Sequence, residues 1–227
     1  MTGLGALILA SAGFVGTHFA MSHPLRAGMV RMLGQRGFAL VYSLVSIALL
    51  WAMSRFYGSA ADQAPQAYWD AGQAGWVAAT LLMWLGSILF VGSLRRNPAF
   101  PNPGKPLTRI GEAQGVFGIT RHPMMWAFAI WALVHAIVLP TAASLVVSAA
   151  IAILALVGAA GQDKKKALLV GDPWRDWVRR TAFLPFGRGF ASPGGFAFIG
   201  GTLLWLAATL AHGALGYRPA GIWAFFG

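Results

Sequence analysis

The residues of this chain with the clearest potential for chemistry are its five histidines, because it contains no cysteine. Without cysteine it can form no disulfide, thiolate metal site or iron–sulfur cluster, so a metal or cofactor would need histidine, methionine or oxygen ligands. His18 lies about one turn before the end of the first long apolar segment, and His122 begins the fourth. If both segments cross a membrane, these two imidazoles lie at similar depth near one face.

Two imidazoles at similar depth on different helices could be the axial ligands of a haem b. Arginines at the membrane boundary would suit the propionates of the haem, and several lie on the same predicted side. The ordinary alternative for each histidine is a hydrogen bond to a neighbouring helix. The predicted cofactor-binding residues are His18, His122, Arg121, Arg26 and Arg36, with His18 and His122 as the metal ligands.

The sequence around His122 predicts the N-terminus of a helix. Thr120 is expected to be the N-cap, and the proline that follows His122 suits the first helical turn. His122 would then lie beside free backbone N–H groups and the positive charge of Arg121, where it could help hold an anion or present a neutral imidazole. Met124 and Met125 are alternative axial ligands, although a core or lipid-facing position is the simpler interpretation of both.

His135 cannot share a small site with His122. It comes 13 residues later, which places it roughly 20 Å further along a helix and about 140° around it. His135 and His212 could instead form a separate pair toward the opposite face, while His23 lies in the first loop.

The composition of the chain requires lipid as its solvent. Of its 227 residues, 57% are hydrophobic and only 10% are charged, whereas a soluble domain carries roughly 25% charged residues. We therefore predict an all-α fold, a polytopic transmembrane helix bundle of about six spans with a cytoplasmic amphipathic helix. The six predicted spans contain no charged residue and are residues 4–21, 38–54, 74–94, 123–139, 141–160 and 196–215.

The basic residues indicate the orientation of these spans. The first, third and fifth loops, residues 23–37, 95–121 and 161–190, carry three, five and seven of the 17 basic residues. These loops fall on one side of a six-span chain, which the positive-inside rule places in the cytoplasm. The sequence thus predicts a bacterial inner-membrane protein with both termini in the periplasm. The net charge of +11 is explained by topology and contact with anionic lipid, so nucleic acid is not an expected partner.

Two cytoplasmic segments have distinctive patterns. Four prolines between positions 97 and 106 predict an extended, non-helical arm. Beyond the fifth span, Asp172 is expected to cap an amphipathic helix on which Trp174 and Trp177 share one face and arginines the other. This helix could be an interfacial anchor or could help to close a site.

Several motifs together resemble the NnrU family over roughly residues 1–190. The resemblance is carried by THF at 17–19, SHPLR at 22–26, LGQRGF at 33–38, YSLVS at 42–46 and GITRHPMMW at 118–126. Residues 191–227 are interpreted as an additional C-terminal transmembrane helix and tail.

The NnrU resemblance implies a role in denitrification and nitric-oxide metabolism. The family is related to the zeta-carotene isomerases, which are membrane haem b enzymes that isomerise a cis double bond when the iron is reduced. His18 and His122 match the histidines implicated in haem binding there. The implied function is a redox-linked role in nitrogen-oxide metabolism or the isomerisation of a lipid-phase polyene. The implied partners are membrane lipid, a hydrophobic small-molecule substrate and a redox partner.

A second resemblance is to the isoprenylcysteine carboxyl methyltransferases. Arg121-His122-Pro123 at the start of a span, followed by a cytoplasmic amphipathic helix ending in Phe-Leu-Pro, is similar to that group, in which the Arg-His-Pro loop and a paired-Glu motif bind S-adenosylmethionine. This chain has Asp163-Lys164 where that group has Glu-Glu. A membrane methyltransferase is therefore the alternative function, and a non-enzymatic scaffold or transport component is a third. Whether the protein is an enzyme stays open at this point.

Overall fold

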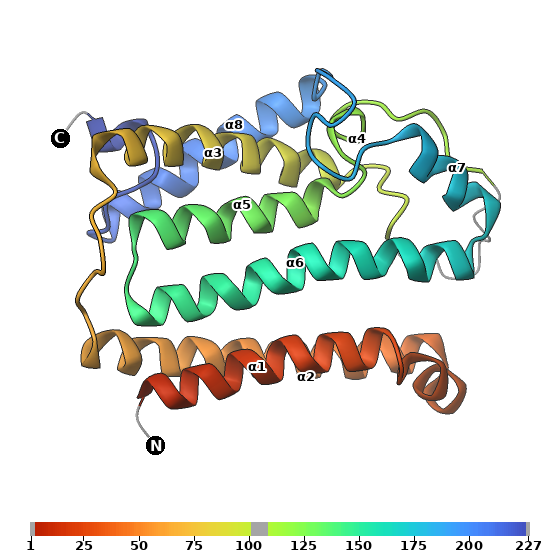
Figure 1. The fold of residues 1–227 in the computed structure, drawn as a ribbon, viewed down its shortest axis with the longest axis horizontal. Helices are drawn as coiled ribbons and strands as arrows, with labels where there is room; N and C mark the ends of the chain where they lie inside the picture. The colour runs from red at the N-terminus through yellow and green to blue at the C-terminus, as the bar shows by residue number, and fades with distance from the viewer. Residues whose placement is uncertain (1–2, 101–108, 226–227) are drawn as a thin grey trace. The chain divides into compact units, whose positions relative to one another are not determined.

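The structure is a computed structural model that describes residues 3–100 and 109–225. In these ranges the chain is helical without any β-strand, which confirms the predicted all-α class (Figure 1). The six predicted apolar segments all form helices. One of them, α5 (Pro123–Val138), has only 16 residues. The other five are long and apolar enough to cross a membrane and are α1 (Gly3–Ser22), α2 (Arg26–Gln63), α3 (Gly72–Ser93), α6 (Ala142–Leu169) and α8 (Gly195–Ala214).

The chain divides into two compact units. The first consists of Met1–Asp70 and His135–Leu154, and the second of Ala71–Val134 and Ala155–Gly227. Both α5 and α6 therefore contribute residues to each unit.

In the first unit, α1 and α2 form an antiparallel hairpin that Figure 1 shows side by side. Leu7 and Phe14 of α1 pack with Met53 of α2 in one buried apolar cluster, which Ala143 and other small residues complete. Gly3 lies so close to α2 that a Cβ there would be 2.9 Å from the carbonyl carbon of Ser59. Small side chains at such points let the helix backbones approach closely, which stabilises helix pairs in lipid.

The first loop, residues 23–37, is mostly helical, in contrast to its expected role as a plain connection. Helix α2 already begins at Arg26, and its geometry is interrupted only at Gly34, with φ 69° and ψ 172°. A residue with a Cβ rarely adopts this backbone conformation. Gly34 thus separates a short basic helical segment from the apolar segment that begins near Phe38.

In the second unit, α3 and α8 pack against each other along their length (Figure 1). A Cβ on Gly201 would lie 2.4 Å from Ile88 Cα, so the two backbones meet there. The indole Nε1 of Trp84 donates a hydrogen bond to Thr202 Oγ1 at 2.9 Å. The end of α3 and the start of α8 are therefore neighbours.

Among the described residues, this unit also contains two short α-helices, α4 (Val116–Ile119) and α7 (Asp172–Arg180), and a 3-10 helix, η1 (Ile222–Phe225). The amphipathic helix predicted after the fifth span is α7, but the predicted cap is wrong. Its N-cap is Gly171, whose φ of 75° favours glycine, and no side chain caps it. Asp172 lies in the first turn and pairs with Arg175. Of the predicted proline arm, positions 101–106 lie outside the described residues.

Candidate functional site

Arg121, His122 and Asp163 form a buried cluster of charged and polar side chains in the second unit. His122 Nε2 lies 3.0 Å from Asp163 Oδ1. Arg121 donates to the other carboxylate oxygen, from Nε at 2.9 Å and from Nη2 at 2.8 Å. The side chain of His122 is fully buried, and those of Arg121 and Asp163 are 11% and 17% exposed. We call these three residues the Arg–His–Asp cluster.

The backbone on either side of the cluster is held by the segment that follows α7. The Arg121 N–H donates to the carbonyl of Ala182 at 2.8 Å, and the N–H of Phe186 donates to Ile119 O at 3.0 Å. The Thr120 hydroxyl donates to Phe183 O at 2.6 Å and accepts from the His122 N–H at 3.2 Å. The predicted N-cap is nevertheless wrong, because α5 begins at Pro123 and Thr120 is instead the C-cap residue of α4.

Phe183 forms one wall of the cluster. Its ring meets the His122 ring edge-on, with centroids 5.3 Å apart, and the guanidinium of Arg121 lies 5.3 Å from its centroid. The Phe183 carbonyl also accepts from Trp126 Nε1 at 2.8 Å. Sequence reasoning did not single out Phe183. The only signal for it was the Phe-Leu-Pro motif, which entered through the methyltransferase resemblance.

The charges of the cluster balance. The negative charge of Asp163 is paired with the positive charge of Arg121. Burying a pair that is both neutralised and hydrogen-bonded costs far less than burying one charge alone. The acceptor Oδ1 of Asp163 places the proton of a neutral His122 on Nε2.

The second ring nitrogen of His122 has a different environment. Nδ1 is buried and has no hydrogen-bond partner within the described residues. With the proton on Nε2, the lone pair of Nδ1 is left for a ligand. A buried polar atom without a hydrogen-bond partner is unusual in a native structure, and one explanation is that it binds an ion or cofactor.

His18 lies in the first unit, in the second half of α1. Its Nδ1 is 2.7 Å from the carbonyl of Phe14, and its Nε2 is 3.2 Å from Ser46 Oγ. Since the Ser46 hydroxyl also donates to Tyr42 O at 2.7 Å, and a hydroxyl has one hydrogen, Nε2 keeps an available lone pair. The rings of Phe14 and Tyr42 flank the imidazole, with centroids 4.3 and 5.1 Å away.

The structure thus brings together Arg121 and His122 and adds Asp163 to them. His18, Arg26 and Arg36 belong to the first unit, where Arg26 lies 3.5 Å from Gln35 Oε1 and over the Phe38 ring, and Arg36 is exposed. Within ranges 3–100 and 109–225, no three His, Asp or Glu side chains form a metal-binding group.

Comparison with known proteins places this chain in a family. No curated protein and no solved structure matches it. A family model described as NnrU protein matches residues 6–219, which is nearly the whole chain and includes the cluster, most of α1 and the other five apolar helices. The chain is a multi-pass helical membrane protein and belongs to the NnrU family.

Proposed function

We propose that this NnrU-family protein binds a haem b through His18 and His122 and has a redox-linked role, in nitrogen-oxide metabolism or in the isomerisation of a lipid-phase polyene. One observation carries the proposal. His122 is anchored through Nε2 to Asp163, while its Nδ1 is buried without a partner in the described part of the chain.

Both histidines have the donor arrangement of a metal ligand. A ligating histidine commonly donates its second ring N–H to a carboxylate or backbone carbonyl, which fixes the ring and raises its basicity. The carboxylate of Asp163 has this role for His122, and the carbonyl of Phe14 has it for His18. The donor sets of both histidines therefore fit such a group. The proposed ligand atoms are Nδ1 of His122, which has no partner among the described residues, and Nε2 of His18, from which the Ser46 hydroxyl at 3.2 Å would have to move.

A bound haem b would supply an iron that cycles between the ferric and ferrous states. The chain's own residues would orient the imidazole that holds it. Asp163 holds the His122 ring in one tautomer, Arg121 balances the charge of Asp163, and Phe183 covers one edge of the ring. Arg26 and Arg36 are the proposed partners of the propionates.

An absorption spectrum tests the proposal. The protein, purified in detergent from haem-replete cells, should show a Soret band, and His18→Ala and His122→Ala should each lose most of it. His212→Ala is the control, because the His212 side chain is exposed and, among the described residues, bonds only to Ala208 O of its own helix. Absence of a Soret band, or a band unchanged in both variants, would refute the proposal.

The alternative is an S-adenosylmethionine-dependent membrane methyltransferase. The structure favours it in one respect, since Asp163 meets Arg121 and His122 as the methyltransferase resemblance requires. Both oxygens of Asp163 are already occupied, however, so neither is free for a cationic cofactor. Calorimetric titration with S-adenosylmethionine distinguishes the two. Binding that Asp163→Asn abolishes would favour the methyltransferase.

A non-enzymatic scaffold or transport role would be favoured if His18→Ala and His122→Ala left the cellular phenotype unchanged.

We also propose that the protein lies in the bacterial inner membrane with both termini in the periplasm. The support is the concentration of basic residues in alternate loops.

A further inference from the structure

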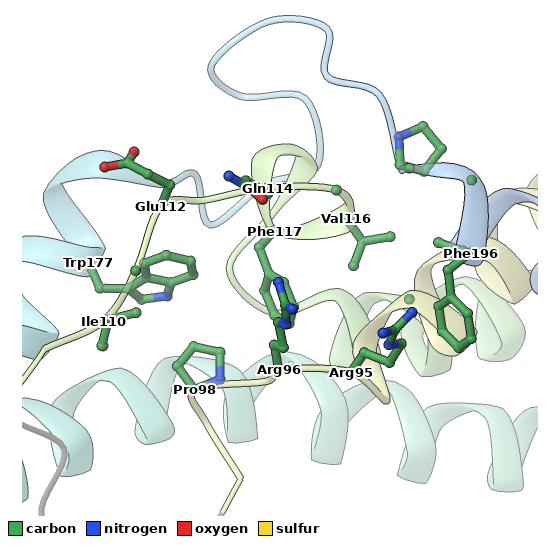
Figure 2. Close-up of a pocket in the computed structure, with 17 residues that line it drawn as sticks. Arg95, Arg96, Pro98, Ile110, Glu112, Gln114, Val116, Phe117, Trp177 and Phe196 are labelled. Atoms are coloured by element: carbon green, nitrogen blue, oxygen red, sulfur yellow. The ribbon is translucent and has the colours of Figure 1, made fainter.

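A pocket of about 530 Å³ lies in the second unit where α3 ends and α8 begins (Figure 2). It is separate from the Arg–His–Asp cluster, none of whose residues lines it. Its walls come from the turn after α3, residues 110–117, α7 and the first turn of α8. We propose that this pocket binds the phosphate headgroup of an anionic phospholipid, with the first carbons of the acyl chains against its apolar wall.

Arg95 and Arg96 give the pocket its charge. Figure 2 shows both side chains directed into it, between Trp177 and Phe196. Among the residues that the structure describes, neither arginine makes an ion pair; Arg95 lies over the Phe196 ring at 4.6 Å. Arginine is well suited to phosphate because its planar donors match the phosphate oxygens. Two such groups facing one pocket provide a site for an anion.

The one carboxylate that lines the pocket does not cancel this charge. Glu112 lies 3.9 Å from Arg180, which also donates to the carbonyls of Ile110 and Gly111. Arg180 therefore offsets Glu112 while holding the 110–111 backbone in place. The described residues that line the pocket, together with Arg180, therefore have a net positive charge, which comes from Arg95 and Arg96.

The first turn of α8, which lies beside Arg95, offers further donors. Gly194, Gly195, Phe196 and Ala197 all line the pocket. The first N–H groups of a helix lack acceptors within it and lie at the positive end of its dipole. A Cβ on Gly195 would meet no described heavy atom within 4 Å, so the space beside this turn is open.

The apolar wall and the location favour a lipid over a soluble phosphate. Val116, Phe117 and Trp177 line the pocket, and the rings of Phe117 and Trp177 are in contact, with centroids 6.1 Å apart. The pocket lies at the ends of two helices long enough to span a membrane, where headgroups are found. Basic pockets at the ends of transmembrane helices are typical sites for anionic lipid headgroups. Phe196, which also lines the pocket, is 49% exposed, and a small soluble anion would leave its ring without an apolar partner.

Native mass spectrometry of the whole detergent-solubilised protein tests this assignment. Phosphatidylglycerol should be retained in preference to phosphatidylcholine, and Arg95→Gln/Arg96→Gln should weaken its retention roughly tenfold or more. The matched control is Arg175→Gln/Arg179→Gln, which removes the same charge from two exposed, carboxylate-paired arginines of α7. It should retain phosphatidylglycerol as the parent protein does. An equal loss in both double variants would indicate general surface attraction and overturn the proposal.

A second variant separates lipid binding from charge. Gly195→Leu places a side chain in open space beside the pocket and should reduce retention of phosphatidylglycerol several-fold, while circular dichroism shows unchanged helicity. Glycerol 3-phosphate is the soluble competitor. If it displaces phosphatidylglycerol at equal concentration, the site recognises phosphate alone and the lipid assignment is wrong. None of these outcomes depends on haem, so the two proposals fail independently.

Discussion

His122 Nε2 and Asp163 Oδ1 lie 3.0 Å apart although 41 residues separate them in the sequence. Arg121 binds the other carboxylate oxygen. The side chain of Asp163 therefore links the start of α5 to the end of α6. The carboxylate thus has a structural and a chemical role, since it neutralises a mostly buried arginine and fixes the tautomer of a buried histidine.

Replacing Asp163 with Asn should destabilise the protein. The variant keeps the shape of the side chain but leaves the mostly buried Arg121 without its counter-charge, which we expect to cost about 3 kcal/mol. Thermal unfolding in detergent should show a clear decrease in Tm. The double variant Arg121→Gln/Asp163→Asn should lose less stability than the sum of the two single variants, because the charges are removed together. Asp176→Asn, in an exposed pair with Arg179, is the control and should change Tm little. Strictly additive losses would show that the pair is not coupled.

Thr120→Val should loosen the segment that precedes α5. The Thr120 hydroxyl is buried, donates to Phe183 O and accepts from the His122 N–H. Valine has nearly the same shape but leaves the His122 N–H without its acceptor and removes one of the two hydrogen bonds that Phe183 O accepts, at an expected cost of about 1–3 kcal/mol. Thr17→Val provides the comparison, since Thr17 bonds only to carbonyls of its own helix. Equal Tm values for the two variants would argue against a role for Thr120 in holding the two segments together.

Gly201→Ala should separate α3 from α8. The new Cβ would lie 2.4 Å from Ile88 Cα, a backbone atom that cannot move without the helix. We expect a loss of at least about 1–3 kcal/mol, the usual range for overpacking, measured as a lower Tm. Gly213→Ala is the matched substitution in the same helix, where a Cβ meets no described atom within 4 Å. It should be neutral or slightly stabilising, because alanine favours helix over glycine. A similar decrease in both variants would contradict close contact at Gly201.

Single-cysteine labelling should reveal the orientation of the loops. The chain has no cysteine of its own, so each introduced thiol gives an unambiguous signal. Ala67→Cys, in the exposed link between α2 and α3, should react with a membrane-impermeant maleimide in cells with a permeabilised outer membrane. Ser192→Cys, exposed before α8, should react only after the inner membrane is disrupted. The reverse pattern would refute the proposed topology.

The limits of sequence-based prediction are visible in individual helices. The bounds of α1, α3 and α8 agree with the apolar runs to within two residues, because a run of apolar residues in lipid must form its backbone hydrogen bonds internally. The sequence did not predict that α2 and α6 continue beyond their apolar parts, to Gln63 and Leu169. Hydropathy detects the lipid-facing part of a helix and not its polar extension.

The candidate site, too, could be predicted from the sequence only in part. From the sequence, Arg121 and His122 were expected at a helix N-terminus on the basic side of the membrane, because Thr and Pro beside them have local backbone preferences. That Asp163 binds both could not be derived from spacing. The methyltransferase resemblance alone hinted at it, and it named the neighbouring Lys164 as well.

For the two tryptophans of α7, the sequence likewise predicted the local arrangement but not the contacts. Their shared helical face follows from the sequence, but it was equally compatible with a lipid anchor and a protein contact. In the structure Trp174 and Trp177 are almost fully buried, and Trp177 packs on Phe117.

The sequence by itself therefore determined the all-α membrane class, the positions of the apolar helices and the placement of Arg121 and His122 at the start of one of them, since each depends on neighbouring residues. Only the tertiary structure decided which distant residues meet them. It placed Asp163 against His122 and formed the Arg95–Arg96 pocket between α3, α7 and α8. Such contacts depend on how helices pack, and packing depends on side chains far apart in the chain.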